Sequence, residues 1–231
     1  MSEPDVVLVW TTIFLGCVAV VAPSLSEVVR RRFFGPKLSL EFDLSPPSCH
    51  KTRLLYTSSN GQQVIDPVFV YRMSVRNRGR SQARKCECVL EGVDVANDSG
   101  LIEPYGWTTP VSLPWGSGYA DFVDINPTRV FFCDLLTVPA ERFQKISARS
   151  GFWLKSQNPS SSPLSIILNL KAAFFSQPNR LTAGEYRLHV ALFAENAAEV
   201  RITLHVNWSG RWKEAEGEFF RECIVSRENA S

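Results

Sequence analysis

Two histidines on neighbouring predicted strands form the best candidate in the sequence for a metal site. His189 and His205 lie on the polar sides of residues 186–194 and 200–208, which flank the turn-forming segment "AENAAE". We expect these strands to form a hairpin in a register that places His189 directly across from His205. Imidazole nitrogens bind transition metals, but the sequence places no third ligand beside the pair. An exposed or hydrogen-bonded pair is therefore the main interpretation, and metal binding is the alternative.

Hydroxyl and carboxylate residues occur without the spacing of a catalytic site. The segments "GWTTP", "WGSG" and "WSGRW" offer serine, threonine and glycine but no strand–turn–helix setting for a nucleophile, and "WGSG" lacks the rest of a phosphate-binding loop. Asp121 and Asp124, like Glu195 and Glu199, do not show the arrangement of a glycosidase pair. We expect no cofactor and no catalytic activity.

The six cysteines are expected to be reduced thiols rather than metal ligands. Cys86 and Cys88 are two residues apart, which points both side chains to one face of a strand but does not match the spacing of zinc-binding pairs. Reduced core cysteines suit a cytoplasmic domain. For a domain outside the cytoplasm, the alternative is a disulfide from Cys86 or Cys88 to Cys133.

Tryptophans offer the clearest candidates for a partner surface. Trp107 and Trp115 lie in a Pro- and Gly-rich loop, where an aromatic side chain either plugs the end of a β-sandwich or forms an exposed surface suited to a protein partner. Trp208 is in phase with Val206 and Leu204 and is expected in the core.

The segments that position these side chains have the pattern of β-strands. Residues 37–44, "KLSLEFDL", alternate strictly between apolar and polar side chains, as in a half-buried strand. No long helical period follows residue 35, although short helical turns are possible near residues 140–146 and 213–227. Long irregular stretches are expected at residues 45–67, 97–117 and 139–163. Further strands are expected at residues 69–77, 83–93, 120–125, 129–138, 165–175, 186–194 and 200–208.

Two of these strand pairs resemble a known sandwich family. "VYRMSVRNRGRSQARKCECVLEGV" resembles the strand–turn–strand of bacterial and archaeal immunoglobulin-like domains of the adhesion-related CARDB type, and "AGEYRLHVALFAENAAEVRITLHV" is similar to their closing hairpin. The resemblance implies an antiparallel immunoglobulin-like β-sandwich. We expect about seven to nine strands in a domain at residues 37–212, followed by a tail at residues 213–231.

The N-terminal region has the features of an uncleaved membrane anchor. Residues 6–22 are 17 residues without a charge. As a helix they would cover roughly 26 Å, slightly less than the hydrocarbon core of a bilayer, so we expect the transmembrane helix and its juxtamembrane turn to occupy residues 6–29. Residues 30–36 then form an interfacial stop, in which three cations precede two aromatic rings: Arg30, Arg31, Arg32, Phe33 and Phe34.

Two other interpretations of this region are weaker. A cleaved secretory signal needs a basic leader, whereas "MSEPD" is acidic, and Pro23 makes cleavage after Ala22 unfavourable. "FLGC" has a faint likeness to a lipoprotein cleavage site but lacks the same leader. A buried core helix does not explain the cluster of arginines.

The distribution of charge predicts the orientation. All 25 Lys and Arg residues lie at or after Arg30, whereas three of the 23 acidic residues precede it. Because positive charge near a span is retained on the cytoplasmic side, we expect a cytoplasmic domain, with residues 1–5 on the other side of the membrane. The surplus of cations suits an anionic membrane surface but is too small for a nucleic-acid binder.

The sequence thus predicts a single-pass membrane protein with a β-sandwich that serves in interaction, scaffolding or sensing. Its expected partners are the lipid bilayer, through residues 6–29, and another protein; nucleic acid is not expected. One alternative is a subunit or enzyme of a membrane-associated system, with a site in the long loops or at His189 and His205. The other alternative is an exported, anchored, adhesion-like domain.

Overall fold

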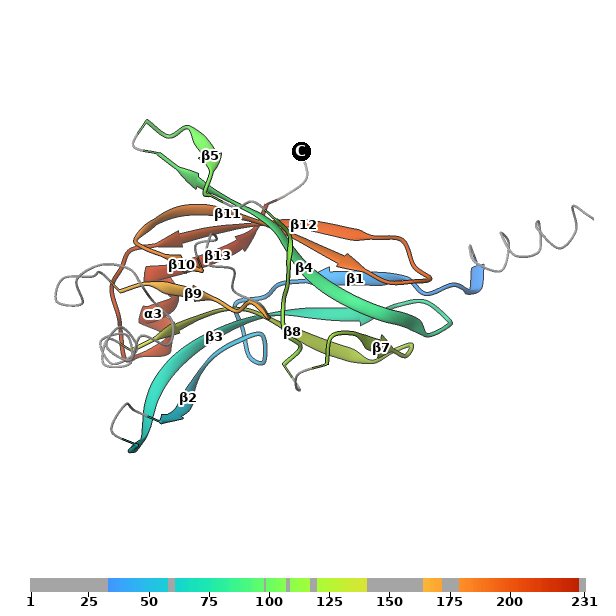
Figure 1. Cartoon of the computed structure of the whole chain (residues 1–231), viewed down its shortest axis with the longest axis horizontal. Helices are drawn as coiled ribbons and strands as arrows, with labels where there is room; N and C mark the ends of the chain where they lie inside the picture. Colours follow the sequence, from blue (N-terminus) through green and yellow to red (C-terminus); the bar gives the residue numbers. More distant parts are fainter. Residues whose placement is uncertain are drawn as a thin grey trace, which may run out of the picture.

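Across the residues that the structure describes, the chain forms a mainly β structure of two antiparallel sheets, with the short helix α3 near the C-terminus (Figure 1). This computed structural model describes residues 33–57, 61–97, 99–106, 109–116, 120–140, 164–171 and 179–228. Within those ranges, no helix is long and apolar enough to cross a bilayer. The predicted anchor at residues 6–29, like Arg30, Arg31 and Arg32, lies outside the described residues.

The first sheet is built around β3 (Gln63–Asn77), a long strand that is buried along most of its length from Val68 onward. One edge of β3 pairs with β2 (Cys49–Thr57) along residues 63–71 and with β1 (Leu38–Glu41) along residues 74–77. Two shorter strands therefore share one edge of the long strand. The other edge pairs with β8 (Val130–Pro139). The sheet then continues through β9 (Ile166–Leu168) and β10 (Arg180–Leu181).

The second sheet has the order β13-β12-β11-β4-β5, with two further short strands on β4. Its centre is the antiparallel set of β4 (Ala83–Ala96), β11 (Gly184–Phe193) and β12 (Val200–Trp208). The shorter strands are β5 (Ile102–Pro104), β6 (Val111–Ser112), β7 (Val123–Ile125) and β13 (Cys223–Arg227).

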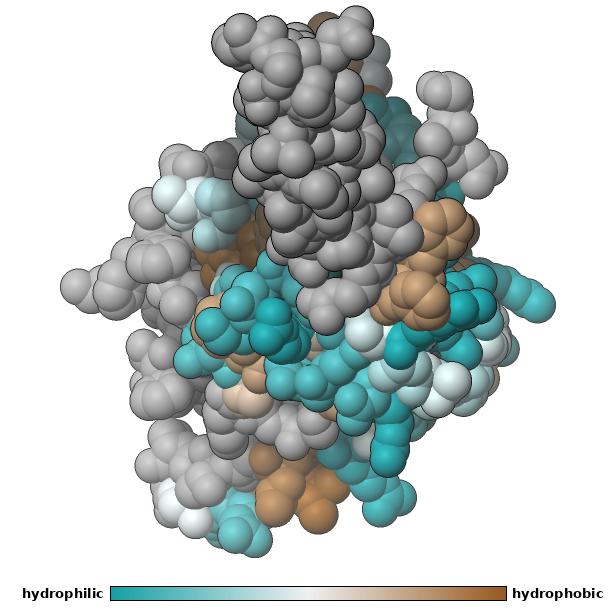
Figure 2. All heavy atoms as spheres, turned by 90° about the vertical axis from the view of Figure 1, so that its right-hand side faces the viewer, coloured by the Kyte–Doolittle hydropathy of each residue, from teal (hydrophilic) through white to brown (hydrophobic). Residues whose placement is uncertain are grey.

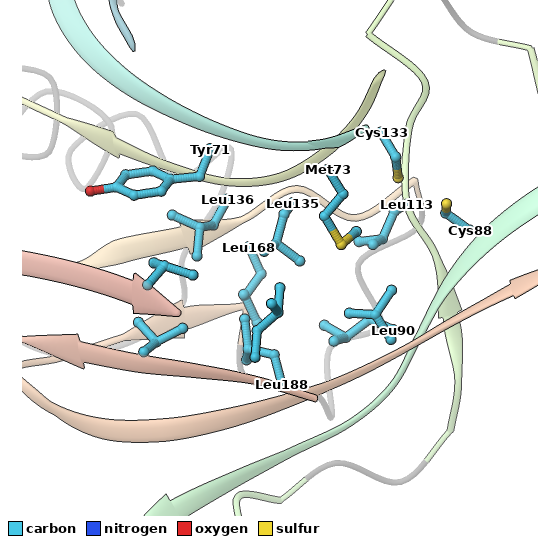
Figure 3. Packing of buried hydrophobic residues seen from close by; sticks show 14 of the residues in the cluster. Tyr71, Met73, Cys88, Leu90, Leu113, Cys133, Leu135, Leu136, Leu168 and Leu188 are labelled. Atoms are coloured by element: carbon cyan, nitrogen blue, oxygen red, sulfur yellow. The ribbon is translucent and has the colours of Figure 1, made fainter. Parts of the chain in front are cut away.

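The core lies between the two sheets, where Tyr71, Met73 and Leu135 of the first sheet face Leu90 and Leu188 of the second (Figure 3). Helix α3 (Glu216–Glu222) covers one end of this core. Its Phe219 side chain is fully buried and stacks on Phe69, with ring centroids 3.7 Å apart.

The strand pattern predicted from the sequence is confirmed for the long strands and was incomplete elsewhere. The described residues alone form thirteen strands, more than the expected seven to nine. β2 falls inside the stretch 45–67 that was expected to be irregular. The expected tail at residues 213–231 contains α3 and β13, and β13 pairs with β12, so the second sheet continues beyond residue 212.

Candidate functional site

The chain enters the fold at one end of the sandwich, which we call the proximal end and define as residues 33–37, 77–85, 124–129 and 194–199. In Figure 1 it is the right-hand end, where the blue segment before β1 meets the β3–β4 and β11–β12 turns. The distal end is the opposite end, which α3 covers.

The buried side chain of Asn77 ties three segments of the proximal end together. Its Oδ1 accepts hydrogen bonds from the backbone N–H groups of Lys37 (3.2 Å) and Gly79 (2.9 Å). Its Nδ2 donates to the carbonyl oxygens of Ser81 (2.8 Å) and Ile125 (2.9 Å). Only 1 % of Asn77 is exposed, and its hydrogen bond to Ile125 O is buried while the other three are partly buried. The start of β1, the β3–β4 turn and β7 are therefore held in one arrangement.

Gly79 allows the segment before β1 to pass against the β3–β4 turn. A Cβ atom at residue 79 would lie 2.4 Å from Gly35 O, 2.4 Å from Lys37 N and 2.6 Å from Pro36 Cα. All three are backbone atoms, which have little freedom to move aside. Two backbone hydrogen bonds hold the same contact, from Arg78 N to Lys37 O (2.7 Å) and from Arg80 N to Gly35 O (3.3 Å).

Two aromatic side chains stand at the point where the chain enters the proximal end. Phe33 is 63 % exposed and Phe34 is 52 % exposed, values that are high for apolar residues of this size. The guanidinium carbon of Arg80 lies 5.5 Å from the centroid of the Phe34 ring, a cation–π contact. The predicted interfacial residues that the structure describes are thus on the surface, beside a cation from another segment.

Cations outnumber carboxylates on the proximal end. Arg84 and Lys85 follow the β3–β4 turn, and the hydrogen bond from Asn196 to Gln82 O joins the β11–β12 turn to them. Glu195 lies 3.6 Å from Lys85, and Glu199 is paired with Arg201. Figure 2 faces this end and shows hydrophilic residues across its middle. The six cations are Lys37, Arg78, Arg80, Arg84, Lys85 and Arg129, and the three carboxylates are Asp124, Glu195 and Glu199.

A carboxylate on β1 is paired with two of the neighbouring arginines. Glu41 forms ion pairs with Arg78 and Arg76 and accepts a hydrogen bond from Ser39. Burial alone would raise the pKa of Glu41, but the hydrogen bonds from Arg78 and Ser39, together with the two arginine charges, lower it. Glu41 therefore stays ionised and neutralises part of the adjacent positive charge.

The histidine register expected from the sequence is wrong by two residues. His189 lies opposite Thr203, and His205 lies opposite Arg187. Each imidazole has a separate carboxylate neighbour: His189 Nε2 is 2.7 Å from an Asp94 oxygen, and His205 Nε2 is 3.9 Å from a Glu185 oxygen. Within the described ranges, no three His, Cys, Asp or Glu side chains are grouped to hold a metal ion.

The surface around His189 is a shallow pocket of about 310 Å³ on the outer face of the second sheet. His189 Nδ1 is 3.3 Å from Thr203 Oγ1, so Asp94, His189 and Thr203 form a short polar row. Arg201 and Glu91 at the same pocket are paired with each other. The polar groups of this pocket are thus paired with one another.

A larger hollow of about 610 Å³ lies beside β1 and the Pro46–Pro47 turn. Its lining includes Glu41 and Asp43 as well as Arg76 and Arg227. Because both signs of charge are present, the hollow has no clear preference for an anionic or a cationic ligand.

The cysteines and tryptophans that the structure describes belong to the core. Five cysteines are free thiols and fully buried: Cys49, Cys86, Cys88, Cys133 and Cys223. Trp115 is 2 % exposed and forms an isolated bridge with Cys133, so it plugs the sandwich and does not line a partner surface. Trp208 is confirmed as a core residue at 1 % exposure. Trp107 lies outside the described residues.

Sequence reasoning identified Phe33 and Phe34 but missed their connection to the β3–β4 turn. The Asn-x-Gly pattern at Asn77 and Gly79 was interpreted as a turn signal, and nothing in it indicates that the side chain of Asn77 reaches Lys37 and Ile125. A comparison with protein-family models finds no match to the chain, and a comparison with curated proteins likewise finds none.

Proposed function

We propose that this protein is a single-pass, membrane-anchored binding module whose β-sandwich is immunoglobulin-like and faces the cytoplasm. The observation that carries the proposal is that residues 35–37, just after the predicted stop, are clamped to the proximal end. The uncharged stretch of residues 6–22 and the arginines that follow it lead directly into a segment clamped by Asn77 and Gly79. An anchor attached in this way restricts the domain to one surface and raises its effective concentration for partners there.

The distal side supports a protein partner. Three apolar side chains are exposed on the hairpin of β2 and β3: Leu54 (38 %), Leu55 (58 %) and Ile65 (59 %). Leu55 lies directly opposite Ile65 in the register, so they form one cross-strand apolar pair. The hairpin projects away from the segment that precedes β1 (Figure 1). Neighbouring apolar side chains that are exposed to solvent are typical of an interaction surface.

Membrane fractionation of the full chain tests the anchor. We expect the protein to stay with the membrane through alkaline carbonate extraction, and a variant with arginines at Val9, Leu15 and Val20 to be released. Circular dichroism of both proteins checks that the sandwich is intact. Release of the wild-type chain by carbonate contradicts the anchor.

Sidedness needs an introduced cysteine, because the five native cysteines of the described ranges are buried. Ser226 is exposed on the edge strand β13, so Ser226→Cys in a Cys17→Ser background gives one accessible thiol. We expect a membrane-impermeant maleimide to label it in lysed cells but not in intact cells. Labelling in intact cells contradicts a cytoplasmic domain and favours the exported, adhesion-like alternative.

A further inference from the structure

We propose that the proximal end of the sandwich docks on an anionic lipid surface, so that the domain stands on the membrane with its distal end pointing away. This inference rests on the proposed function, because it requires residues 6–29 to be the anchor. It goes further by assigning a lipid-binding role to turns of the folded domain that are distant in sequence from the anchor.

The length of the connection makes this contact possible. The backbone is fixed to the sandwich from Gly35 onward by the hydrogen bond from Arg80 N and the close approach of Gly79. Only Phe33 and Phe34 separate Gly35 from the three arginines of the predicted stop. Two extended residues span at most about 7 Å, which is shorter than the Debye length of about 10 Å at moderate ionic strength. With the predicted stop at the headgroups, residues 35–37 and the β3–β4 turn bonded to them therefore lie within electrostatic reach of the lipid.

The composition of the proximal end fits an anionic partner. The proximal end carries six cations, which come from three separate segments, and three carboxylates. Two ion pairs reach outside this set: Glu199 pairs with Arg201, and Arg78 pairs with Glu41, so the surplus of cations is unchanged. The distal segment 211–222 has the opposite balance, with three cations and four carboxylates. Since anionic lipids attract clustered Lys and Arg, the charge asymmetry favours one orientation of the domain.

The aromatic residues complete the surface. Phe33 and Phe34 are more than half exposed in the described chain, and aromatic rings are favoured at the boundary between headgroups and hydrocarbon. The contact of Arg80 with Phe34 joins this apolar pair to the cations of the β3–β4 turn. Lipid headgroups and the outer acyl region thus offer a matching partner for both kinds of side chain.

Quenching by spin-labelled lipid in nanodiscs tests the orientation with the full chain. A fluorophore is attached to Ser81→Cys at the proximal end or to Glu218→Cys on α3 as the distal control, both in a Cys17→Ser background. Both positions are exposed. We expect headgroup-labelled lipid to quench the probe at residue 81, more strongly when phosphatidylglycerol is added to phosphatidylcholine, and to leave the probe at residue 218 unchanged. High salt should remove the additional quenching that phosphatidylglycerol causes at residue 81.

Charge variants separate lipid attraction from mere proximity. The double variant Arg80→Gln and Arg84→Gln should lose the additional quenching that phosphatidylglycerol causes at residue 81. The double variant Arg211→Gln and Lys213→Gln, on the distal side, should retain it. Thermal unfolding of each variant confirms that the sandwich is folded. Co-elution of the chain with nanodiscs is measured first. Absence of co-elution overturns the anchor and this inference together, whereas co-elution with quenching that is independent of phosphatidylglycerol overturns this inference alone.

Discussion

Cys88 of β4 and Cys133 of β8 belong to different sheets, and their side chains point toward each other in the core (Figure 3). Both residues are fully buried. Burial and the neighbouring Cys88 raise the pKa of Cys133 well above that of a free thiol. The two sheets therefore meet at a pair of neutral sulfurs packed as small apolar groups, and the predicted reduced core cysteines are confirmed within the described ranges.

These thiols should be inert in the folded protein. Burial raises the pKa of Cys49, Cys86 and Cys223 to about 12. At pH 8 about one thiol in 10⁴ would then be a reactive thiolate. We expect iodoacetamide to leave all five described cysteines unmodified in the native state and to alkylate them in denaturant, as measured by mass spectrometry of peptides. Ser226→Cys is the accessible control, and rapid native labelling of Cys88 or Cys133 contradicts the packing described.

Gly79→Ala should destabilise the protein by about 1–3 kcal/mol, the usual cost of overpacking a tight contact. The added methyl would meet the backbone at Gly35, Pro36 and Lys37 at distances no side chain tolerates. Urea unfolding measures the loss. Gly217→Ala is the matched control, because a methyl at residue 217 meets nothing within 4 Å and alanine favours the helix. Equal stability of both variants shows that the segment before β1 can move aside.

Glu41 should give a small, acid-sensitive contribution to stability. Its pKa in the folded state is lowered from the ordinary value of 4.5, so its contribution is present above that pH and is lost as pH falls through the folded value. The side chain is 35 % exposed, which limits the effect to less than about 1 kcal/mol. Glu41→Gln should therefore be less stable than wild type at pH 7 and equal to it at strongly acidic pH. Urea unfolding measures the difference in stability between Glu41→Gln and wild type. The assignment is contradicted if this difference does not change with pH, or if Glu218→Gln, at an exposed residue, shows an equally large difference.

Phe219→Ala should cost about 3–5 kcal/mol, as for other large side chains removed from a core. Its ring stacks on Phe69 and packs near Trp208, with ring centroids 5.8 Å apart, so its loss leaves a cavity under α3. Thermal and urea unfolding measure the change. Ile224→Ala, at a residue that is 43 % exposed on β13, should cost far less. Similar losses for the two variants mean that α3 is not part of the core.

The sequence was informative where one face of a strand is buried and the other is exposed. "KLSLEFDL" shows that pattern, and β1 forms at Leu38–Glu41 within it. β2 was not predicted because residues 51–55 are all partly or largely exposed. Such a strand has no alternation of buried apolar and exposed polar residues that the sequence could reveal. The β11–β12 hairpin was predicted correctly, but a register error of two residues keeps the same faces and is invisible to periodicity.

The proximal end could not be predicted in the same way. The contacts of Asn77 join residues 40 and 48 positions away, and such partners follow from the packing of the whole sandwich rather than from local propensity. The same holds for the aromatic cluster of Phe69 and Phe219, which joins β3 to a helix near the C-terminus. Local pattern indicated the turn and an interfacial role for Phe33 and Phe34, but only the tertiary structure connects them.

The position of β1 has a mechanical consequence. β1 begins at the proximal end and runs antiparallel along β3, with Leu38 paired to Asn77 and Glu41 paired to Ser74. A pull between the proposed N-terminal anchor and the proposed partner at the distal end would act along this strand, perpendicular to its hydrogen bonds. The bonds are then loaded together in shear and do not open one after another, so the short first strand is suited to bear tension.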